Sequence, residues 1–194
     1  MSLCQEEILA MRRCRRGSKE AFELFVRKYM KEAYFIALGL VGNREDAMDL
    51  SQEAFVRAYR NIKQLEPQRR FFPWFYQILK NLCFSHLRKR RRRQTSSLDA
   101  TDCPEVGAVD DSFEPEVIAD RNETKKAVWK AIARLDDKHR EVIILRHFRN
   151  LSYEQMAEAL FCNKGTVTSR LYYARKRLKE LLGSGKGGCI NEVS

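Results

Sequence analysis

The sequence predicts an all-α protein of two small helical domains joined by an acidic flexible linker. Every strong hydrophobic periodicity has helical spacing, with apolar residues at steps of three and four. The chain has only four prolines and no run of alternating β-branched residues that would indicate a strand. Residues 94–115 have no period and are rich in Ser, Thr, Asp, Gly and Pro, which is typical of a linker.

Residues 1–93 are expected to form the first domain, with helices at 5–15, 19–41, 44–62 and 71–92. Ser18 and Asn43 precede the second and third helices and are good N-caps. Glu45 and Asp46 fall in the first turn of the third helix, where they complement the helix dipole. The fourth helix begins in aromatic residues and ends in the basic run from Arg88 to Arg93.

Residues 116–183 are expected to form the second domain, followed by a flexible tail at 184–194; its helices fall at 116–135, about 137–148, 153–160 and 166–182. Asp136 or Asp137 caps the second of these helices. Ser152 and Gln155 form a capping box in front of the third. Asn163 is the expected cap of the last helix.

The last two helices have the pattern of a helix-turn-helix. The final helix has one apolar face, and its other face carries short hydroxyls and an Arg near its start, where a major-groove reader meets base edges. Basic residues follow further along, where phosphates would lie. The alternative is an αα-hairpin with a solvated basic face, and the hydroxyl pattern favours DNA binding. Phe161 occupies a turn position that is often Gly, because φ is positive there.

Charge is distributed in three blocks within a total of +11. Residues 1–93 hold 21 basic and 10 acidic residues, and residues 121–194 hold 16 basic and 8 acidic residues. Residues 94–120 hold eight acidic residues and no Lys or Arg. Two basic blocks suit a polyanionic partner such as nucleic acid.

The six cysteines show no CxxC spacing, and the three histidines complete no metal pattern, so we expect free thiols, no metal and no cofactor. A redox or metal-sensing role for Cys103 or Cys189 is a minor alternative. No apolar run reaches the roughly 20 residues of a membrane span, and the N-terminus lacks the features of a signal peptide. We therefore expect a cytoplasmic protein without membrane insertion.

Two surfaces of the first domain are unusual. One is the polar face that runs from Asp46 to Arg57, which could also be an ordinary solvated face. The other is the run from Phe71 to Tyr76, with five aromatic residues in six positions next to Arg69 and Arg70. Some of these rings must pack the core, but aromatic residues interleaved with cations also form a stacking platform for unpaired bases.

Four motifs occur in order along the chain: Asp49-Leu-x-Gln52-Glu53-x-Phe55, Pro73-Trp74-Phe75 with Asn81 and Arg88, Leu151-Ser-Tyr-Glu-x-Met-Ala, and Gly165-Thr-Val-x-Ser-Arg-Leu-x-x-Ala-Arg. Together they resemble bacterial RNA polymerase sigma factors, specifically the extracytoplasmic-function (ECF) group of the sigma-70 family. The resemblance runs from about Cys4 to Leu182. It implies that residues 1–93 are sigma domain 2 and residues 116–183 are sigma domain 4.

The resemblance also implies roles for particular residues. Domain 4 would read the −35 element through Lys164, Thr166, Thr168, Ser169, Arg170, Tyr172, Tyr173, Arg175 and Arg177. Domain 2 would bind and help to open the −10 element through Arg69, Arg70, Phe71, Trp74, Asn81, Ser85, Arg88 and Arg91. The polymerase-binding residues would be Asp46, Asp49, Gln52, Glu53 and Arg57.

The implied partners are core RNA polymerase, through its β′ clamp helices and β subunit, promoter DNA and an anti-sigma factor. The acidic linker would pass through polymerase channels that otherwise hold nucleic acid. Two residues depart from the family pattern: Ser85 stands where Asp is frequent, and Phe161 stands where Gly is usual.

Two other functions would account for parts of the sequence. A stand-alone helix-turn-helix regulator would use the same final helices, but it would leave the aromatic-basic helix and the acidic linker without a purpose. An enzyme acting on nucleic acid would need paired carboxylates near a Lys or His, a phosphate-binding loop or a metal set, and none of these patterns is present in the sequence. The sequence therefore favours a promoter-specificity subunit without catalytic residues.

Overall fold

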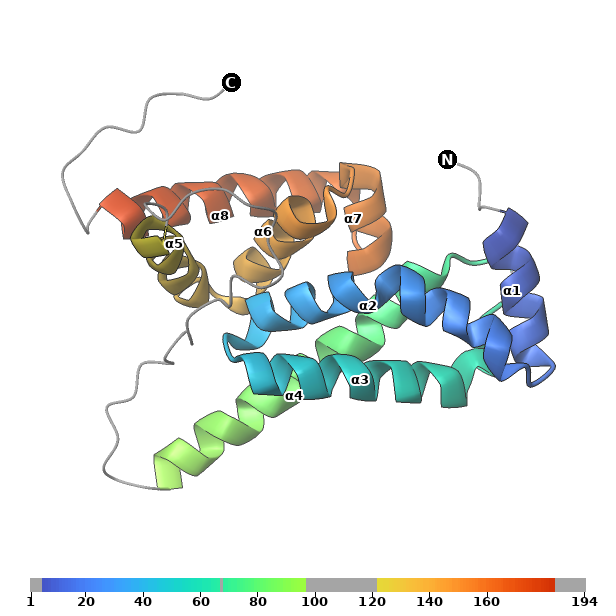
Figure 1. Cartoon of the computed structure of the whole chain (residues 1–194). Coiled ribbons are helices and arrows are strands. Elements are labelled where there is room, and N and C mark those ends of the chain that lie inside the picture. Colours follow the sequence, from blue (N-terminus) through green and yellow to red (C-terminus); the bar gives the residue numbers. More distant parts are fainter. Residues whose placement is uncertain (1–4, 67, 97–121, 184–194) are drawn as a thin grey trace.

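The computed structural model describes residues 5–66, 68–96 and 122–183, and every regular element in these ranges is a helix (Figure 1). The elements are α1 (Gln5–Arg15), α2 (Lys19–Val41), α3 (Arg44–Asn61), the 3-10 helix η1 (Ile62–Gln64), α4 (Phe71–Ser96), α5 (Asn122–Ala133), α6 (Asp137–Arg149), α7 (Tyr153–Leu160) and α8 (Lys164–Gly183). The predicted all-α class is confirmed.

The predicted caps fix the starts of five helices. Ser18 Oγ accepts from the Ala21 amide at 3.2 Å, and Asn43 Oδ1 accepts from the Asp46 amide at 3.0 Å. The other three caps follow the same plan, at Asp136 for α6, Ser152 for α7 and Asn163 for α8. Each side chain satisfies an amide that has no partner within its own helix.

Some helix ends differ from the prediction. α4 continues to Ser96 instead of ending near residue 92, because the basic run consists of good helix formers with no Gly or Pro to stop it. α8 begins at Lys164, one residue after its cap. Residues 94–96, predicted to begin the acidic linker, are the end of α4. The rest of the linker and the tail at 184–194 lie outside the described residues.

Helices α1 to α4 form a bundle in which α2 packs along α3 and across α4 (Figure 1). Aromatic rings fill its centre. The Phe71 ring stacks on Phe25 and Phe75, with centroids 4.2 Å and 5.4 Å away, and the Tyr29 ring lies 5.6 Å away. Phe25, Phe71, Phe75 and Tyr76 are at most 1% exposed. The aromatic run at the start of α4 is therefore chiefly the core of this bundle.

Helices α5 to α8 form the second unit, in which α8 packs on α6 and α7. The predicted apolar stripe of α8 is its buried face, because Val167, Leu171 and Ala174 are at most 1% exposed. Met156 of α7 and Leu145 of α6 are buried with them. The helix-turn-helix is thus held in part by buried contacts within this unit.

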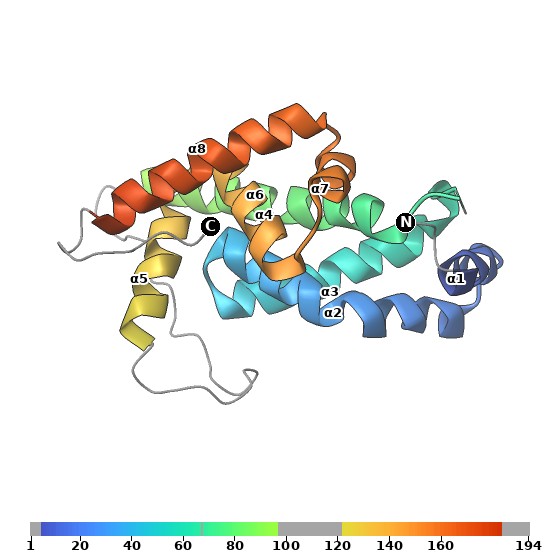
Figure 2. The same ribbon diagram turned by 90° about the horizontal axis from the view of Figure 1, so that it is seen from above.

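The two units pack directly on each other, which the sequence did not predict (Figure 2). α6 lies against α2, and α7 lies against α4. Gly39 of α2 makes the first contact possible, because a Cβ there would stand 2.8 Å from Ile144 Cδ1. Buried side chains of both units form one continuous hydrophobic cluster. We call this packing of α6 on α2 and of α7 on α4 the closed arrangement of the two units.

Buried charges also cross this interface. Glu141 of α6 is buried, and its Oε1 accepts from Tyr76 Oη at 2.7 Å and from Lys80 Nζ at 2.6 Å, both on α4. Burial raises the pKa of Tyr76 well above its usual value, so the hydroxyl stays protonated and donates. Arg149 pairs with Glu32 and places its guanidinium 4.2 Å from the centre of the Phe72 ring. We call the Tyr76, Lys80 and Glu141 group the Glu141 network.

Arg140 is a second buried charge that joins the units. Its guanidinium donates to the carbonyls of Leu40, at 3.0 Å, and Leu135, at 2.9 Å. It also bonds to the carbonyls of Ile132 and Ala133 near the end of α5. Burial is the main cause that lowers the pKa of Arg140, whose side chain serves as a cap for carbonyls that the helix ends leave without partners.

Candidate nucleic-acid interface

The exposed side of α8 carries the residues that the sequence analysis predicted to contact the −35 element. We define the α8 face as Lys164, Thr166, Thr168, Ser169, Arg170, Tyr172, Tyr173, Arg175 and Arg177. Thr166 and Arg170 are half-buried, and the other seven residues are exposed. The face points away from the core because the buried stripe occupies the other side of the helix. Figure 1 shows α8 along the edge of the molecule that lies away from α3.

Hydrogen bonds orient the hydroxyls at the start of this face. Asn163 Oδ1 accepts from the amide of Thr166 at 2.7 Å and from its hydroxyl at 2.8 Å. The hydroxyls of Thr168 and Ser169 donate to carbonyls one turn back, those of Lys164 and Thr166. Their oxygens keep lone pairs that can accept from base amino groups, so the start of α8 presents short acceptors in fixed positions.

Two of the cations on the face have acidic partners, and two have none among the described residues. Lys164 pairs with Glu154 at the start of α7, and Arg177 Nη1 lies 2.9 Å from Glu180 Oε2. The hydrogen bond from Lys164 is the largest cause that lowers the pKa of Glu154 to about 2. Within the described ranges, Arg170 and Arg175 form no ion pair with a carboxylate, which leaves them available to an anionic ligand.

The turn before α8 contains the predicted positive φ. Phe161 has φ 50° and ψ 46°, and its side chain is 68% exposed. The Cys162 amide donates to the Ala157 carbonyl at 3.0 Å and the Phe161 amide donates to the Glu158 carbonyl, which is the Schellman pattern of a helix end. The turn geometry therefore holds although Phe replaces Gly.

The α4 face consists of Arg69, Arg70, Phe71, Trp74, Asn81, Ser85, Arg88 and Arg91, and the structure separates these residues. Asn81, Arg88 and Arg91 are exposed on one side of α4, where Arg88 Nη2 donates to Ser85 Oγ at 3.2 Å. Arg69 pairs with Glu66, and Arg70 reaches Glu158 of α7 across the interface at 3.4 Å.

The two aromatic residues of the α4 face have different environments. Trp74 is half-buried, with its ring 5.9 Å from Phe71 in an edge-to-face contact. Phe71 is 1% exposed between Phe25 and Phe75. In this arrangement the Phe71 side chain is therefore buried among other rings and is not accessible to a base.

The α3 face consists of Asp46, Asp49, Gln52, Glu53 and Arg57. Asp49, Gln52, Glu53 and Arg57 are exposed, and Arg57 Nε donates to Glu53 Oε1 at 2.9 Å. Asp46 is half-buried, with its Oδ2 3.1 Å from His86 Nε2 on α4.

Two apolar residues of this surface were missed by the sequence reasoning. Met48 is 50% exposed and Val56 is 47% exposed on α3. They stand four residues on either side of Gln52, so all three share one side of the helix. That spacing was the signal in the sequence that could have identified them.

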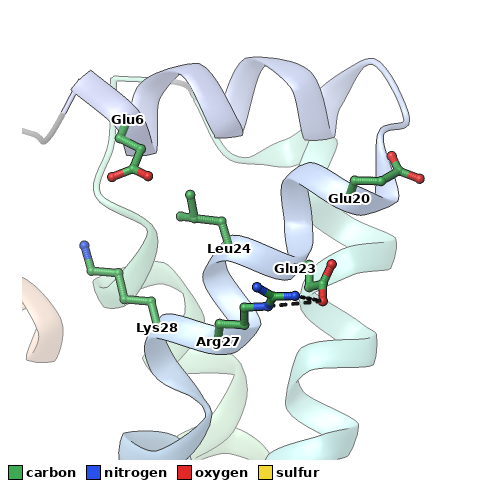
Figure 3. Close-up of a pocket in the computed structure, with 6 residues that line it drawn as sticks. All are labelled: Glu6, Glu20, Glu23, Leu24, Arg27 and Lys28. Carbon is green, nitrogen blue, oxygen red and sulfur yellow. Dashed lines mark hydrogen bonds and ion pairs between the residues drawn. The ribbon is translucent and has the colours of Figure 1, made fainter.

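A surface pocket of about 610 Å³ lies between α1 and α2 (Figure 3). Its lining is mostly charged and consists of Glu6, Glu20, Glu23, Leu24, Arg27 and Lys28. Glu23 and Arg27 pair with each other along α2, and Lys28 pairs with Glu7. Three of the charged side chains that line the pocket, Glu23, Arg27 and Lys28, thus already have partners, and none of the lining residues belongs to the faces defined above.

Cys14, Cys83 and Cys162 are free thiols, as the sequence predicted. Burial raises the pKa of Cys14 to about 11 and that of Cys83 to about 12, which suppresses the reactive thiolate. Cys103 and Cys189 lie outside the described residues. Within the described ranges, no cluster of three or more His, Cys, Asp or Glu side chains could hold a metal ion. None of the helices described has the length and apolar character needed to cross a bilayer.

Comparison with known families identifies both units. Residues 25–93 match the family described as Sigma-70 region 2, and residues 125–178 match Sigma-70, region 4. The chain is 34% identical to the RNA polymerase sigma-H factor of Pseudomonas aeruginosa, over 88% of this chain and 90% of that protein. It is 32% identical to the ECF RNA polymerase sigma factor SigW of Bacillus subtilis, over 89% and 94% of the two chains.

Solved structures agree with this result. A sigma factor RpoE from Bartonella quintana, solved in complex with the anti-sigma factor NepR, is 27% identical with a TM-score of 0.68, over 85% of this chain and 98% of that chain. CnrH, solved with the cytosolic domain of CnrY, shares the fold with a TM-score of 0.70 at 21% identity, over 93% and 99% of the chains.

The family matches and the relatives define a sigma factor, the class of subunit that gives RNA polymerase its promoter specificity. Within that class, the chain belongs to the ECF group of the sigma-70 family. The match decides against the stand-alone regulator, which shares only the helix-turn-helix.

Proposed function

We propose that the α8 face reads the −35 element, that the exposed part of the α4 face and residues 63–70 bind the −10 element, and that the α3 face docks on the β′ clamp helices. The protein then acts in the cytoplasm as a non-catalytic initiation subunit. The observation that carries the proposal is the α8 face, where oriented hydroxyls stand at the start of an exposed helix. Arg170 and Arg175 follow along the same face and have no carboxylate partner among the described residues. Such a helix end suits the major groove.

Replacing Arg170 by Ala is expected to weaken binding to −35-containing promoters by about 1–3 kcal/mol, because an Arg to a guanine edge is worth that much discrimination. The measurement is the affinity of the reconstituted holoenzyme for promoter duplex and for a duplex with a scrambled −35 element. The matched control is Lys130→Ala, which removes an exposed cation from α5. An equal loss on both duplexes would make Arg170 a phosphate contact.

The α3 face combines exposed apolar and charged side chains, which is the composition of a protein-binding surface. Met48→Asp places a charge among the side chains that we propose to be covered by polymerase. We expect the affinity for core polymerase to fall about tenfold or more, because a buried apolar contact is lost and a charge is desolvated. Leu9→Asp is the matched control, since Leu9 is 60% exposed on α1 and is not part of the α3 face. If both variants bind core polymerase equally well, the docking assignment is wrong.

The closed arrangement cannot read both promoter elements at once. The −35 and −10 elements are centred about 25 base pairs apart, which corresponds to about 85 Å of B-DNA. In the structure α7 touches α4, and Arg70 of the α4 face pairs with Glu158 of the helix-turn-helix. We therefore propose that the closed arrangement is the polymerase-free state and that the units separate in the holoenzyme.

We further propose that an anti-sigma factor binds this closed state. The support is the likeness to the Bartonella quintana protein, which spans both units and which was solved with its anti-sigma factor bound. Such a partner would hold the units together and so prevent them from spanning a promoter. Genomic mapping of transcription starts with reconstituted holoenzyme tests the initiation function itself.

A further inference from the structure

Phe161 combines two properties that are rarely found together. Its backbone is in the left-handed region, at φ 50°, and its side chain is 68% exposed. A bulky residue with positive φ is a genuine outlier, because its Cβ crowds the following carbonyl. An exposed ring also gains nothing from burial to offset that strain.

Other helix ends of this chain show what the same geometry normally carries. α2 ends at Gly42 with φ 73°, and α6 ends at Asn150 with φ 47°. Gly and Asn are the residue types that tolerate this conformation. Packing does not explain Phe161, since its side chain is exposed at the turn. Backbone strain that packing does not explain is typical of functional sites, so we infer that the exposed Phe161 side chain contacts a ligand.

The position of the turn indicates the ligand. Phe161 lies two residues before Asn163, so their Cα atoms are at most about 7.6 Å apart. Asn163 Oδ1 holds Thr166, the first hydroxyl of the α8 face. Lys164 neutralises Glu154 nearby, so that carboxylate does not repel a phosphate backbone. The ring therefore stands beside the helix end that we propose to enter the major groove.

We propose that Phe161 is a specificity residue that packs against the 5-methyl group of a thymine in the −35 element. Thymine is the one base that presents a methyl group in the major groove, and a Phe ring is one of the apolar groups that contact it. The inference rests on the proposed role of the α8 face. Phe161 would thus add an apolar contact with a base to the polar contacts proposed for Arg170 and the hydroxyls.

Replacing each −35 thymine in turn by uracil, which removes only the methyl group, tests this contact. The holoenzyme with the natural chain should lose about fourfold in affinity at one position, the ratio expected for one buried methyl-sized group. With Phe161→Gly the uracil duplex should bind no worse than the thymine duplex. The same variant should bind the thymine promoter about fourfold more weakly while its Tm rises by about 2–4 °C, because glycine relieves the strain.

Three outcomes would overturn the proposal. One is Phe161→Gly with a raised Tm and unchanged promoter affinity. Another is a Phe161→Gly variant that loses equal affinity for the thymine and uracil duplexes at every position. The third is weaker binding to core polymerase with DNA affinity unchanged, which would place the ring on the polymerase.

Arg170→Ala, measured beside Phe161→Gly, separates this inference from the proposed function. If Arg170→Ala weakens −35 binding and Phe161→Gly does not, only the thymine contact fails. If neither variant matters, the assignment of the α8 face itself is wrong.

Discussion

Glu141→Ala is expected to open the closed arrangement in the free protein. Glu141 is 3% exposed between the units, and its one oxygen accepts from both Tyr76 and Lys80. Without the carboxylate, the Lys80 ammonium would remain at the interface with its partner removed. Removing one member of a buried ion pair costs about 3–5 kcal/mol, which is enough to reverse a closed-to-open equilibrium.

The radius of gyration in solution measures this effect. A compact chain of this length has a radius of about 16 Å, and separated units on a tether give a larger value. Amide hydrogen exchange should also quicken where α7 covers α4, while the interior of each unit stays protected. Because each unit has buried residues of its own, we expect opening to be the response, and not unfolding.

Glu158→Ala is the matched control. Glu158 also forms an ion pair across the interface, with Arg70, but both side chains are partly exposed, at 45% and 30%. Pairs of this kind contribute about 0–1 kcal/mol. Its radius should therefore match that of the natural chain. An unchanged radius in Glu141→Ala would show that apolar contacts hold the units together without the Glu141 network.

Opening should change function as well as shape. If the closed arrangement is the polymerase-free state, Glu141→Ala removes a step that precedes assembly. The association rate with core polymerase should rise, because only open chains assemble with it. The factor of the rise gives the inverse of the fraction of natural chains that are open. The affinity for an anti-sigma factor should fall in parallel, because that partner is proposed to bind the closed state.

Much of each unit was predictable because its causes are local. Ser18, Asn43 and Asn163 cap helices as their types and positions indicate. The apolar stripe of α8 became its buried face, since one helical period fixes which residues share a side. Motifs in a fixed order identified the family for the same reason: each depends on spacing along the chain.

The packing of the units on each other was not predictable in this way. Periodicity shows which side of a helix is buried but not what covers it. Glu141 and Arg140 stand in an ordinary charged stretch. The partners of Glu141 come from α4, and Arg140 donates to Leu40 of α2 as well as to carbonyls of its own unit. In the sequence Gly39 is only a weak helix former, and the structure shows that Ile144 packs against it. Contacts across a long separation in sequence determined these roles.

The aromatic run of α4 shows the same limit at the scale of one turn. Five rings in six positions indicated both a core and a base-binding platform, but composition could not assign each ring. The structure assigns Phe71 to the core at 1% exposure and leaves Trp74 half-buried at the surface. Two substitutions three residues apart should therefore have opposite effects.

Phe71→Ala is expected to lower the free energy of unfolding by about 3–5 kcal/mol, because it leaves a cavity between Phe25, Tyr29 and Phe75. Thermal unfolding of the full chain measures it, and the midpoint should fall by about 2–4 °C for each kcal/mol. At a temperature where the variant is folded, its binding to single-stranded −10 DNA as holoenzyme should be normal. A selective loss of that binding would return Phe71 to the DNA surface.

Trp74→Ala should give the converse result. Its half-buried ring contributes less to the core, so the unfolding midpoint should change less than in Phe71→Ala. Stacking of one unpaired base on an aromatic ring is worth about 1–3 kcal/mol. Affinity for single-stranded −10 DNA and the rate of open-complex formation should therefore drop about five- to 150-fold. Duplex −35 binding provides the internal control, because α8 lies on the other unit and keeps its contacts. If open-complex formation is unchanged, base capture depends on Asn81, Arg88 and Arg91 without an aromatic platform.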